Sequence, residues 1–411
     1  MTRKHIILEA SEVFRKDGRT QAPENSIPES MGTSCAVDAP SALSRIRESG
    51  LVGMGGAGYP TWKKLARDKG YSVVVANAAE CEPLLEQNVA RLETDSDRIL
   101  SGLGIAMQIV GASRGIVAIK AKNTDALETL DASVRRFKDA QQDGTRLSVA
   151  LLEDRYPVGD ARAVVRDVLG SLIGPAAHTS SAGALVLNVE TLLRIHEILV
   201  EGKPVATKDI TVAGIIDGSG YERDTSLVLY DVPIGTTIRQ VLRALHITPP
   251  RPDAQFLLGG PYMGDPAQLD DPVTGTSGGI MIAGPELQDR GPVGVIVCAC
   301  GASRDRLAAI VDAQGARLAG TVNCKNVVTL PDGRLKCANP GVCPGQAQAV
   351  LSLRKQGATS LLISHCTDCT NTVMQIAPKL GMRVHHATDA YLRAGGERLI
   401  RAHREPRPAD R

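Results

Sequence analysis

Short apolar runs alternate with longer amphipathic stretches along the first half of the chain. The apolar runs have the length and β-branched content of buried strands, and they cover residues 71–76, 115–120, 147–152 and 184–187. Residues 124–138 have a helical pattern, and Asp38 is placed to cap a shorter helix that Gly50 ends. Strands that alternate with helices favour an α/β layer around a largely parallel sheet.

The pattern changes near residue 205. Two strand-like runs, a helical stretch and a further strand-like run follow in that order at 209–214, 226–232, 235–242 and 256–260. This order predicts a small β-grasp module, in which a hairpin packs on one helix. A connector rich in Gly, Pro and Asp then leads to a last strand candidate at 293–297, which opens the final unit.

Composition and charge narrow the class of protein. The 411 residues carry 47 basic and 45 acidic side chains, and this formal net charge of +2 gives no field that would hold a nucleic acid. No apolar run approaches the ~20 residues that span a bilayer, and the first residues do not form a secretory signal. We therefore expect a cytoplasmic protein with no direct membrane insertion. Its cysteines are then expected to be thiols rather than structural disulfides.

Four glycines crowd into six positions of one loop, at Gly53, Gly55, Gly56 and Gly58. Such a backbone exposes consecutive N–H groups and admits a ligand without Cβ collisions, which suits a phosphate. Lys63 and Lys64 follow as countercharge, and Tyr59 and Trp62 offer faces for a flat ring. Neither the P-loop nor the dinucleotide fingerprint fits the spacing. The residues alone leave two interpretations, a site for a phosphate-bearing cofactor and a tight loop packed under a helix.

Several motifs in order give this loop a specific resemblance. They are Gly53-Met54-Gly55-Gly56-Ala57-Gly58-Tyr59-Pro60-Thr61 with Lys64, Asn77-Ala78-Ala79-Glu80-Cys81-Glu82-Pro83, Leu187-Asn188-Val189-Glu190-Thr191 and Leu258-Gly259-Gly260-Pro261-Tyr262-Met263-Gly264. Together they resemble the flavin/NADH-binding core of the RnfC family and of the complex I 51-kDa (NuoF) family. The resemblance covers residues 48–285 and includes the soluble-ligand-binding β-grasp (SLBB) module of these proteins.

The resemblance implies FMN and NAD(H) as cofactors and assigns roles to residues. Gly53, Gly55, Gly56 and Gly58 would line the nucleotide, Lys64 would contact the flavin phosphate or ring, and Asn77 and Asn188 would hydrogen-bond the isoalloxazine or ribityl chain. Glu80 and Glu82 would orient a nicotinamide nucleotide on which Tyr59 stacks. One departure affects nucleotide binding, because Ala79 stands where the NuoF motif has Asp. Without the resemblance, Asn77 and Asn188 would be interpreted as turn residues at strand ends.

Seven of the nine cysteines lie within 72 residues near the end of the chain. They are Cys298, Cys300, Cys324, Cys337, Cys343, Cys366 and Cys369. Four thiolates hold an iron–sulfur cluster, and a 4Fe–4S centre is our first expectation. Zinc, a dithiol relay at the last pair and ordinary buried cysteines are the alternatives. Our first choice of ligands is the two close pairs at 298/300 and 366/369, because such pairs at two strand ends can meet at one sheet edge.

The tail departs from RnfC. It lacks the twin C-x-x-C-x-x-C-x-x-x-C-P ferredoxin runs, and from Cys298 to Cys369 it resembles the delta subunit of methyl-viologen-reducing hydrogenases. An RnfC-like core without twin ferredoxins is similar to the PrdC-like electron-transfer proteins that accompany proline reductase. His365 stands beside the last cysteine pair, either as a ligand or as a packing residue.

These observations predict a modular α/β chain. Its segments are an N-terminal arm (1–35), a Rossmann-like flavin/NADH domain (36–204), an SLBB β-grasp domain (205–262), a connector (263–292), a cysteine-rich α/β domain (293–400) and a tail (401–411).

The expected function is electron transfer. Electrons from a reduced nicotinamide nucleotide or ferredoxin would pass through a flavin to an iron–sulfur centre and on to a partner reductase, peripheral to a membrane complex if its partners have one. No side chain is singled out as catalytic. The alternative is a non-catalytic scaffold or a zinc-stabilised docking module for a partner enzyme.

Overall fold

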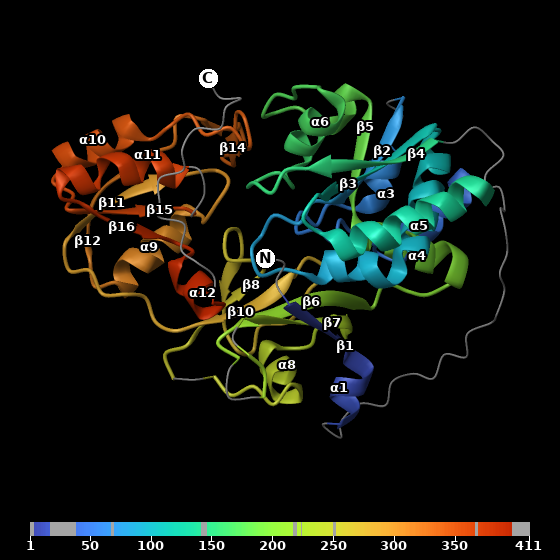
Figure 1. The fold of residues 1–411 in the computed structure, drawn as a ribbon, viewed down its shortest axis with the longest axis horizontal. Helices are drawn as coiled ribbons and strands as arrows, with labels where there is room; N and C mark the ends of the chain where they lie inside the picture. Colours follow the sequence, from blue (N-terminus) through green and yellow to red (C-terminus); the bar gives the residue numbers. More distant parts are fainter. Residues whose placement is uncertain are drawn as a thin grey trace.

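The computed structural model describes residues 4–16, 38–66, 70–140, 146–216, 220–222, 224–249, 252–365 and 369–396. Within them the chain builds three units, each around its own sheet (Figure 1). The first and third sheets are parallel, and the second is mixed. The expectation of an α/β protein with parallel sheets is confirmed.

The first unit contains a four-stranded parallel sheet in the order β4-β3-β2-β5. Its strands are β2 (Val73–Ala78), β3 (Arg114–Lys120), β4 (Arg146–Leu152) and β5 (Ala184–Asn188). Its helices are α2 (Ala39–Glu48), α3 (Thr61–Leu65), α4 (Gln87–Val110), α5 (Thr124–Ala140), α6 (Ala161–Leu169) and α7 (Val189–His196), with the short turns η1 (Thr179–Ala182) and η2 (Glu197–Glu201). These strands lie where the apolar runs predicted them.

Alternate residues of these strands pack on opposite faces, so the sheet is covered on both sides. Val74 and Ala76 join the core that α4, α5 and α7 form. Val73 and Val75 face the core that contains α6. Helices α4 and α7 approach so closely that a β-carbon on Gly102 would lie 1.9 Å from the main-chain oxygen of Leu192.

The second unit is a six-stranded sheet in the order β1-β7-β6-β10-β8-β9. Its strands are β1 (Lys4–Glu9), β6 (Thr207–Gly214), β7 (Thr225–Pro233), β8 (Gln255–Leu258), β9 (Asp265–Ala267) and β10 (Gly279–Ala283). Helices α1 (Ala10–Lys16) and α8 (Ile238–Ala244) belong to it. The predicted hairpin, helix and closing strand correspond to β6, β7, α8 and β8.

Two segments of this sheet differ from the sequence-based division. Residues 4–9 of the predicted N-terminal arm form β1, which pairs in parallel with β7 because the apolar run Ile6-Ile7-Leu8 gains cover there. The predicted connector contains β10, which is buried along its whole length between β6 and β8. Residues 17–37, and with them the rest of the arm, and the predicted tail at 401–411 lie outside the described residues.

A buried ionic network joins the first two units. Arg91 of α4 donates two hydrogen bonds, of 2.7 and 2.9 Å, to the carboxylate of Asp209 on β6, and a third of 2.9 Å to Asp231 on β7. Arg194 of α7 reaches Asp231 at 2.8 Å. Paired charges of this kind tolerate burial because each carboxylate oxygen has a donor, so the network fixes the position of the first unit on the second sheet.

The third unit, drawn in orange and red in Figure 1, is a parallel sheet in the order β12-β11-β15-β16. Its strands are β11 (Pro292–Val297), β12 (Arg317–Asn323), β15 (Ser360–Ile363) and β16 (Arg383–His386), with a separate hairpin of β13 (Val327–Thr329) and β14 (Leu335–Cys337). Its helices are α9 (Arg304–Ala313), α10 (Ala347–Lys355), α11 (Cys369–Ile376), η3 (Pro378–Leu380) and α12 (Asp389–Ala394). Figure 1 shows β14 opposite α6 of the first unit.

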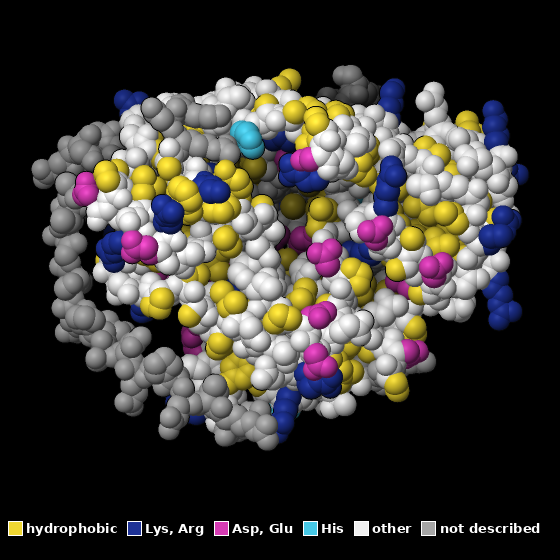
Figure 2. Space-filling model, turned by 180° about the vertical axis from the view of Figure 1, so that it is seen from behind, with side chains coloured by type: hydrophobic (Ala, Val, Ile, Leu, Met, Phe, Trp, Pro, Cys, Tyr) yellow, Lys and Arg dark blue, Asp and Glu magenta, His cyan; other side chains and the backbone are white. Residues whose placement is uncertain are grey.

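The surface and the helices agree with the composition. Figure 2 shows acidic and basic side chains interspersed over the face opposite to that of Figure 1, with no continuous basic stripe on that face. No helix in the described part of the chain combines the length and the apolar character that crossing a membrane requires.

Candidate functional site

The first sheet reverses its strand order between β2 and β5. From β2 the chain proceeds to β3 and β4 on one side, whereas β5 lies on the other side of β2. Asn77 and Asn188 are register partners at the carboxyl ends of these two strands. Ligands of open parallel sheets bind outside the carboxyl ends of the strands at such a reversal, so this edge is the first candidate site.

The glycine loop lies at this edge. Its ends are closed by a hydrogen bond of 2.9 Å from Gly53 N–H to the main-chain oxygen of Tyr59, and Met54 N–H donates to Thr191 Oγ1 of α7 at 3.0 Å. A β-carbon on Gly55 would lie 3.0 Å from the Asn188 side chain, so only glycine fits there without displacing it. Residues 55–57 expose their backbone to solvent. The loop therefore presents bare main chain directly beside Asn188.

The two asparagines are held by their surroundings. Asn77 Nδ2 donates to the main-chain oxygen of Gly159 at 2.9 Å, and Asn77 Oδ1 accepts from Ala79 N–H at 3.2 Å. Asn188 Oδ1 accepts from Glu190 N–H at 2.9 Å and so caps α7. The turn chemistry that the sequence allowed is thus present at both positions, and it orients both amides at the edge of the sheet.

Lys64, Tyr59 and Glu80 were also predicted at this site. Lys64 Nζ donates to the main-chain oxygen of Val186 on β5, so its ammonium lies against the sheet. Tyr59, on the glycine loop, is 40% exposed. Glu80 accepts from Glu82 N–H at 3.0 Å and from Asn88 Nδ2 at 3.1 Å. Of these three, Tyr59 has the most exposed surface.

Glu82 contacts the second unit. Its two carboxylate oxygens accept hydrogen bonds of 2.7 Å from the N–H groups of Tyr262 and Met263. Burial, together with the neighbouring Glu80, raises the pKa of Glu82 to about 8, and the two N–H donors oppose the shift. In this structure, therefore, Glu82 fastens the turn at 262–263, while its nucleotide-orienting role stays a prediction.

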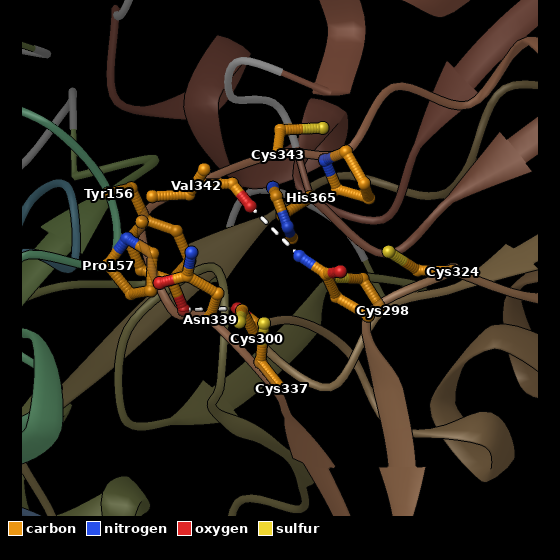
Figure 3. Close-up of a pocket in the computed structure, with 13 residues that line it drawn as sticks. Tyr156, Pro157, Cys298, Cys300, Cys324, Cys337, Asn339, Val342, Cys343 and His365 are labelled. Atoms are coloured by element: carbon orange, nitrogen blue, oxygen red, sulfur yellow. Dashed lines mark hydrogen bonds between the residues drawn. The ribbon is translucent and has the colours of Figure 1, made fainter. Parts of the chain in front are cut away.

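A second site lies where the third unit meets the first (Figure 3). Its cavity has a volume of about 30 Å³. The lining residues are Tyr156, Pro157, Cys298, Cys300, Cys324, Asn326, Cys337, Asn339, Gly341, Val342, Cys343, Pro344 and His365. Five of the seven predicted cysteines converge here. Cys366 lies outside the described residues, and of Cys369 only the backbone at the start of α11 is described.

The strand order explains this convergence. Cys298 follows β11 and Cys324 follows β12, its parallel neighbour, and the two segments are joined by a hydrogen bond of 2.7 Å from Cys324 N–H to the Val297 oxygen. His365 follows β15 on the other side of β11 and is buried. Carboxyl ends of neighbouring parallel strands share one edge, as the sequence-based argument assumed.

Four thiols of this cysteine pocket are linked to one another. Cys300 is hydrogen-bonded to Cys298 and Cys337, and Cys324 is hydrogen-bonded to Cys298. These thiol contacts, followed by burial, raise the pKa of Cys300 and of Cys324, whereas the bond from Cys300 lowers the pKa of Cys337. Among the described residues no three His, Cys, Asp or Glu side chains stand in a group set to hold a metal ion. The thiols line a cavity and contact one another instead.

Arginines of the first unit close the cysteine pocket from the side. Arg162 of α6 donates a hydrogen bond of 2.7 Å to the main-chain oxygen of Cys337. Arg166 reaches the oxygen of Pro340 at 2.5 Å, and Arg155 reaches that of Gly341 at 3.2 Å. Their positive charge lies where deprotonated thiols would need compensation. Sequence reasoning missed these arginines and Tyr156, because nothing near them in the sequence points to a cysteine more than 130 residues away.

Comparison with known proteins defines the class of the first site. Residues 46–197 match the model of the Nuo51 FMN-binding domain, and this range contains the glycine loop, the whole first sheet and Asn188. The likeness to a solved NAD+-reducing NiFe hydrogenase in its H2-reduced state is one of fold, with a TM-score of 0.54 and 20% identity over 69% of this chain and 52% of that chain.

Two curated relatives narrow the class further. The chain is 35% identical over 239 residues to the cobalamin reductase PduS of Salmonella typhimurium, a match that covers 58% of this chain and 49% of the relative. It is 30% identical over 272 residues to the RnfC-type component of the proton-translocating ferredoxin:NAD(+) oxidoreductase complex of Clostridium ljungdahlii, covering 66% and 56%. The chain is therefore RnfC/NuoF-like, and it spans about half the length of these relatives.

Proposed function

We propose that this chain is an electron-transfer component that holds FMN at the edge of its first sheet and an iron–sulfur centre in the cysteine pocket. One observation carries the proposal, namely that the loop after β4 contacts both places. Gly159 of this loop accepts the Asn77 amide, and Tyr156 of the same loop donates to the main-chain oxygen of Cys300. Two sites joined in this way are arranged for exchange of electrons between them.

The first site fits FMN on two counts. The main chain at Gly55–Ala57 is exposed, and a β-carbon at Gly55 would fill the space beside Asn188. Gly53, Gly55, Gly56 and Gly58 would face the phosphate-bearing chain, and Asn77 and Asn188 would hydrogen-bond the ring or its ribityl chain. Bound there, FMN would supply the capacity to accept electrons in a pair and release them singly.

Electrons would enter from a reduced nicotinamide nucleotide or a ferredoxin. Tyr59 is exposed enough to stack on a nicotinamide, and Glu80 lies within the same group of residues. Ala79, which stands where the NuoF motif has Asp, removes one polar contact for the nucleotide. Relatives that are named as a cobalamin reductase and as part of a ferredoxin:NAD(+) oxidoreductase complex support a partner reductase or complex as the next acceptor.

The second site fits a thiolate-bound centre by the chemistry of its donors. Cys298, Cys300, Cys324 and Cys337 provide the four thiolates that a 4Fe–4S centre needs, and Cys343 lies beside them. The arginine side chains around the pocket would offset the negative charge of such a centre.

A zinc-stabilised docking module is the second candidate. The cavity of about 30 Å³ holds a single ion more readily than a cluster, and the linked thiols are close together. This candidate predicts zinc and no visible absorbance from the cysteine pocket.

Paired cysteine variants test the assignment. The full chain is purified without oxygen, and iron, acid-labile sulfide, zinc and FMN are measured in wild type, Cys337→Ala and Cys81→Ala. We expect Cys337→Ala to lose most of its iron and sulfide and keep its FMN, whereas Cys81→Ala, outside the pocket, keeps both. Iron retained by Cys337→Ala would remove this residue from the ligand set, and zinc in place of iron would favour the docking module.

A further inference from the structure

Tyr156 stands at the meeting point of the three units. Its ring contacts Tyr262 of the second unit edge to face, with centroids 4.3 Å apart, and lies 5.3 Å from the ring of His365 in the third unit. Its phenol O–H donates to the main-chain oxygen of Cys300, as the close-up of the pocket shows (Figure 3). One side chain of the first unit therefore touches the turn that carries two of the pocket thiols.

The backbone after Tyr156 leads to the flavin site. Three residues on, the main-chain oxygen of Gly159 accepts the hydrogen bond from Asn77 Nδ2 at 2.9 Å. Three residues span at most ~11 Å when fully extended. The segment is also stiffened internally, because Val158 N–H donates to the Arg155 oxygen at 3.2 Å and Asp160 N–H donates to the Pro157 oxygen at 3.0 Å. A shift of Asn77 is thus passed on through a short, ordered piece of chain.

The far side of the segment is packed as well. A β-carbon on Gly159 would lie 2.5 Å from the Ala79 oxygen and 3.0 Å from Cys81 Sγ. The loop after β2 and the loop after β4 therefore move together or not at all, because no space separates them. At the other end, Arg155 holds the cysteine loop through the Gly341 oxygen at 3.2 Å.

We propose that Tyr156 is a positioning residue that couples the flavin site to the cysteine pocket. Its phenol holds the Cys298–Cys300 turn in place, and its own position is set by the Asn77–Gly159 contact. The inference rests on the proposed function for its role in electron transfer, but the coupling between the two sites is a property of this chain's own residues. Occupation of the flavin site then changes how firmly Cys300 is held.

The reactivity of Cys300 in the metal-free chain tests the coupling. The full-length protein is treated with iodoacetamide, and the alkylation rate of Cys300 is followed by peptide mass spectrometry with and without saturating FMN. The variants are Tyr156→Phe, which loses only the hydroxyl, and the matched control Tyr391→Phe, which loses a buried hydroxyl at another contact between units, 3.5 Å from Gln255 Oε1.

The expected pattern is specific to Tyr156. Without FMN, Cys300 reacts about fivefold faster in Tyr156→Phe than in wild type, the effect of one lost hydrogen bond. FMN slows the reaction in wild type and in Tyr391→Phe, and has little effect in Tyr156→Phe. Equal rates and equal FMN effects in the two variants would overturn the coupling.

Failure of the proposed function has a different signature. If FMN does not bind the wild-type chain, as measured by its fluorescence, the flavin assignment fails, while the rates without FMN still decide whether Tyr156 positions Cys300. If Tyr156→Phe does not fold, as judged by circular dichroism, Asn77→Ala replaces it. That variant is expected to speed the alkylation of Cys300, and an unchanged rate in it would refute the coupling.

Discussion

Gly55 and Asn188 lie so close together that a β-carbon on the glycine would stand 3.0 Å from both Cβ and Nδ2 of the asparagine. The contact joins the glycine loop to the end of β5, at the reversal of the strand order. Any residue larger than glycine must displace either the loop or the amide. The space that a flavin would need is therefore defined by the absence of one side chain.

The first prediction follows from this contact. Gly55→Ala should weaken FMN binding at least tenfold, because the methyl group pushes Asn188 from its position or takes the space of the ligand. Gly174→Ala is the matched control, since a β-carbon there meets no atom within 4 Å. Fluorescence titration of both variants with FMN checks the prediction. Equal affinities in the two variants would mean that the glycine loop does not face the flavin.

Lys64 allows a test of binding against stability. Its ammonium donates to the Val186 oxygen, so it could act on the ligand or only on the sheet. We expect Lys64→Ala to reduce FMN retention several-fold, whereas Lys63→Ala, at the exposed neighbouring position, retains FMN as wild type does. Bound FMN after gel filtration and the melting temperature without FMN are measured together. A lower melting temperature with unchanged FMN content would leave Lys64 only its structural role.

The ionic network between the first two units should dominate their association. Arg91→Met leaves the carboxylates of Asp209 and Asp231 without their main partner, and breaking a buried pair in this way costs about 3–5 kcal/mol. Arg239→Ala removes an exposed ion pair with Asp270 and should leave the unfolding midpoint unchanged. Urea unfolding compares the two. A small effect of Arg91→Met would show that apolar packing alone holds the units together.

Glu286 gives the stability of the chain a pH dependence. It lines a cavity of about 440 Å³ with Arg306 and Tyr391, is 8% exposed, and burial raises its pKa from 4.5 to about 7. The folded state therefore keeps a proton that the unfolded state releases, so its contribution is complete below pH 4.5 and is lost as the pH rises through 7. Arg306 opposes the shift and Asp389 adds to it.

The isosteric variant Glu286→Gln should be insensitive to this titration. Relative to wild type it should gain stability between pH 4.5 and 7, by up to about 3 kcal/mol, and the difference should stay constant above pH 8. Urea unfolding of both proteins at pH 5, 6, 7 and 8 measures the difference. Parallel curves over this range would mean that Glu286 has an ordinary pKa in the folded chain.

The first two sheets show how far the sequence determines the fold. Strands β2 to β5 were predictable because each is a short, β-branched run buried on both faces. Strand β10 has the same character, but the turn residues around Gly279–Ala283 indicated a connector. Strand β1 was missed because its cover comes from β7, more than 200 residues away, and no local pattern records that pairing.

The cysteine pocket marks the limit of the same reasoning for sites. The rule that strand ends meet at one edge brought Cys298 and Cys300 to the right place, but the choice of partners depends on which strands are neighbours. Strand β12 lies beside β11, so Cys324 joins them, and the β13–β14 hairpin brings Cys337. Tyr156 and Arg162 complete the pocket from another unit, which only the tertiary structure can show.

The most direct test of the account is the visible spectrum of the full chain, purified and reconstituted without oxygen, before and after reduction by NADH or dithionite. The account predicts flavin bands and a broad iron–sulfur absorbance that both bleach on reduction, with about one FMN per chain. A colourless protein after reconstitution with FMN, iron and sulfide would contradict it.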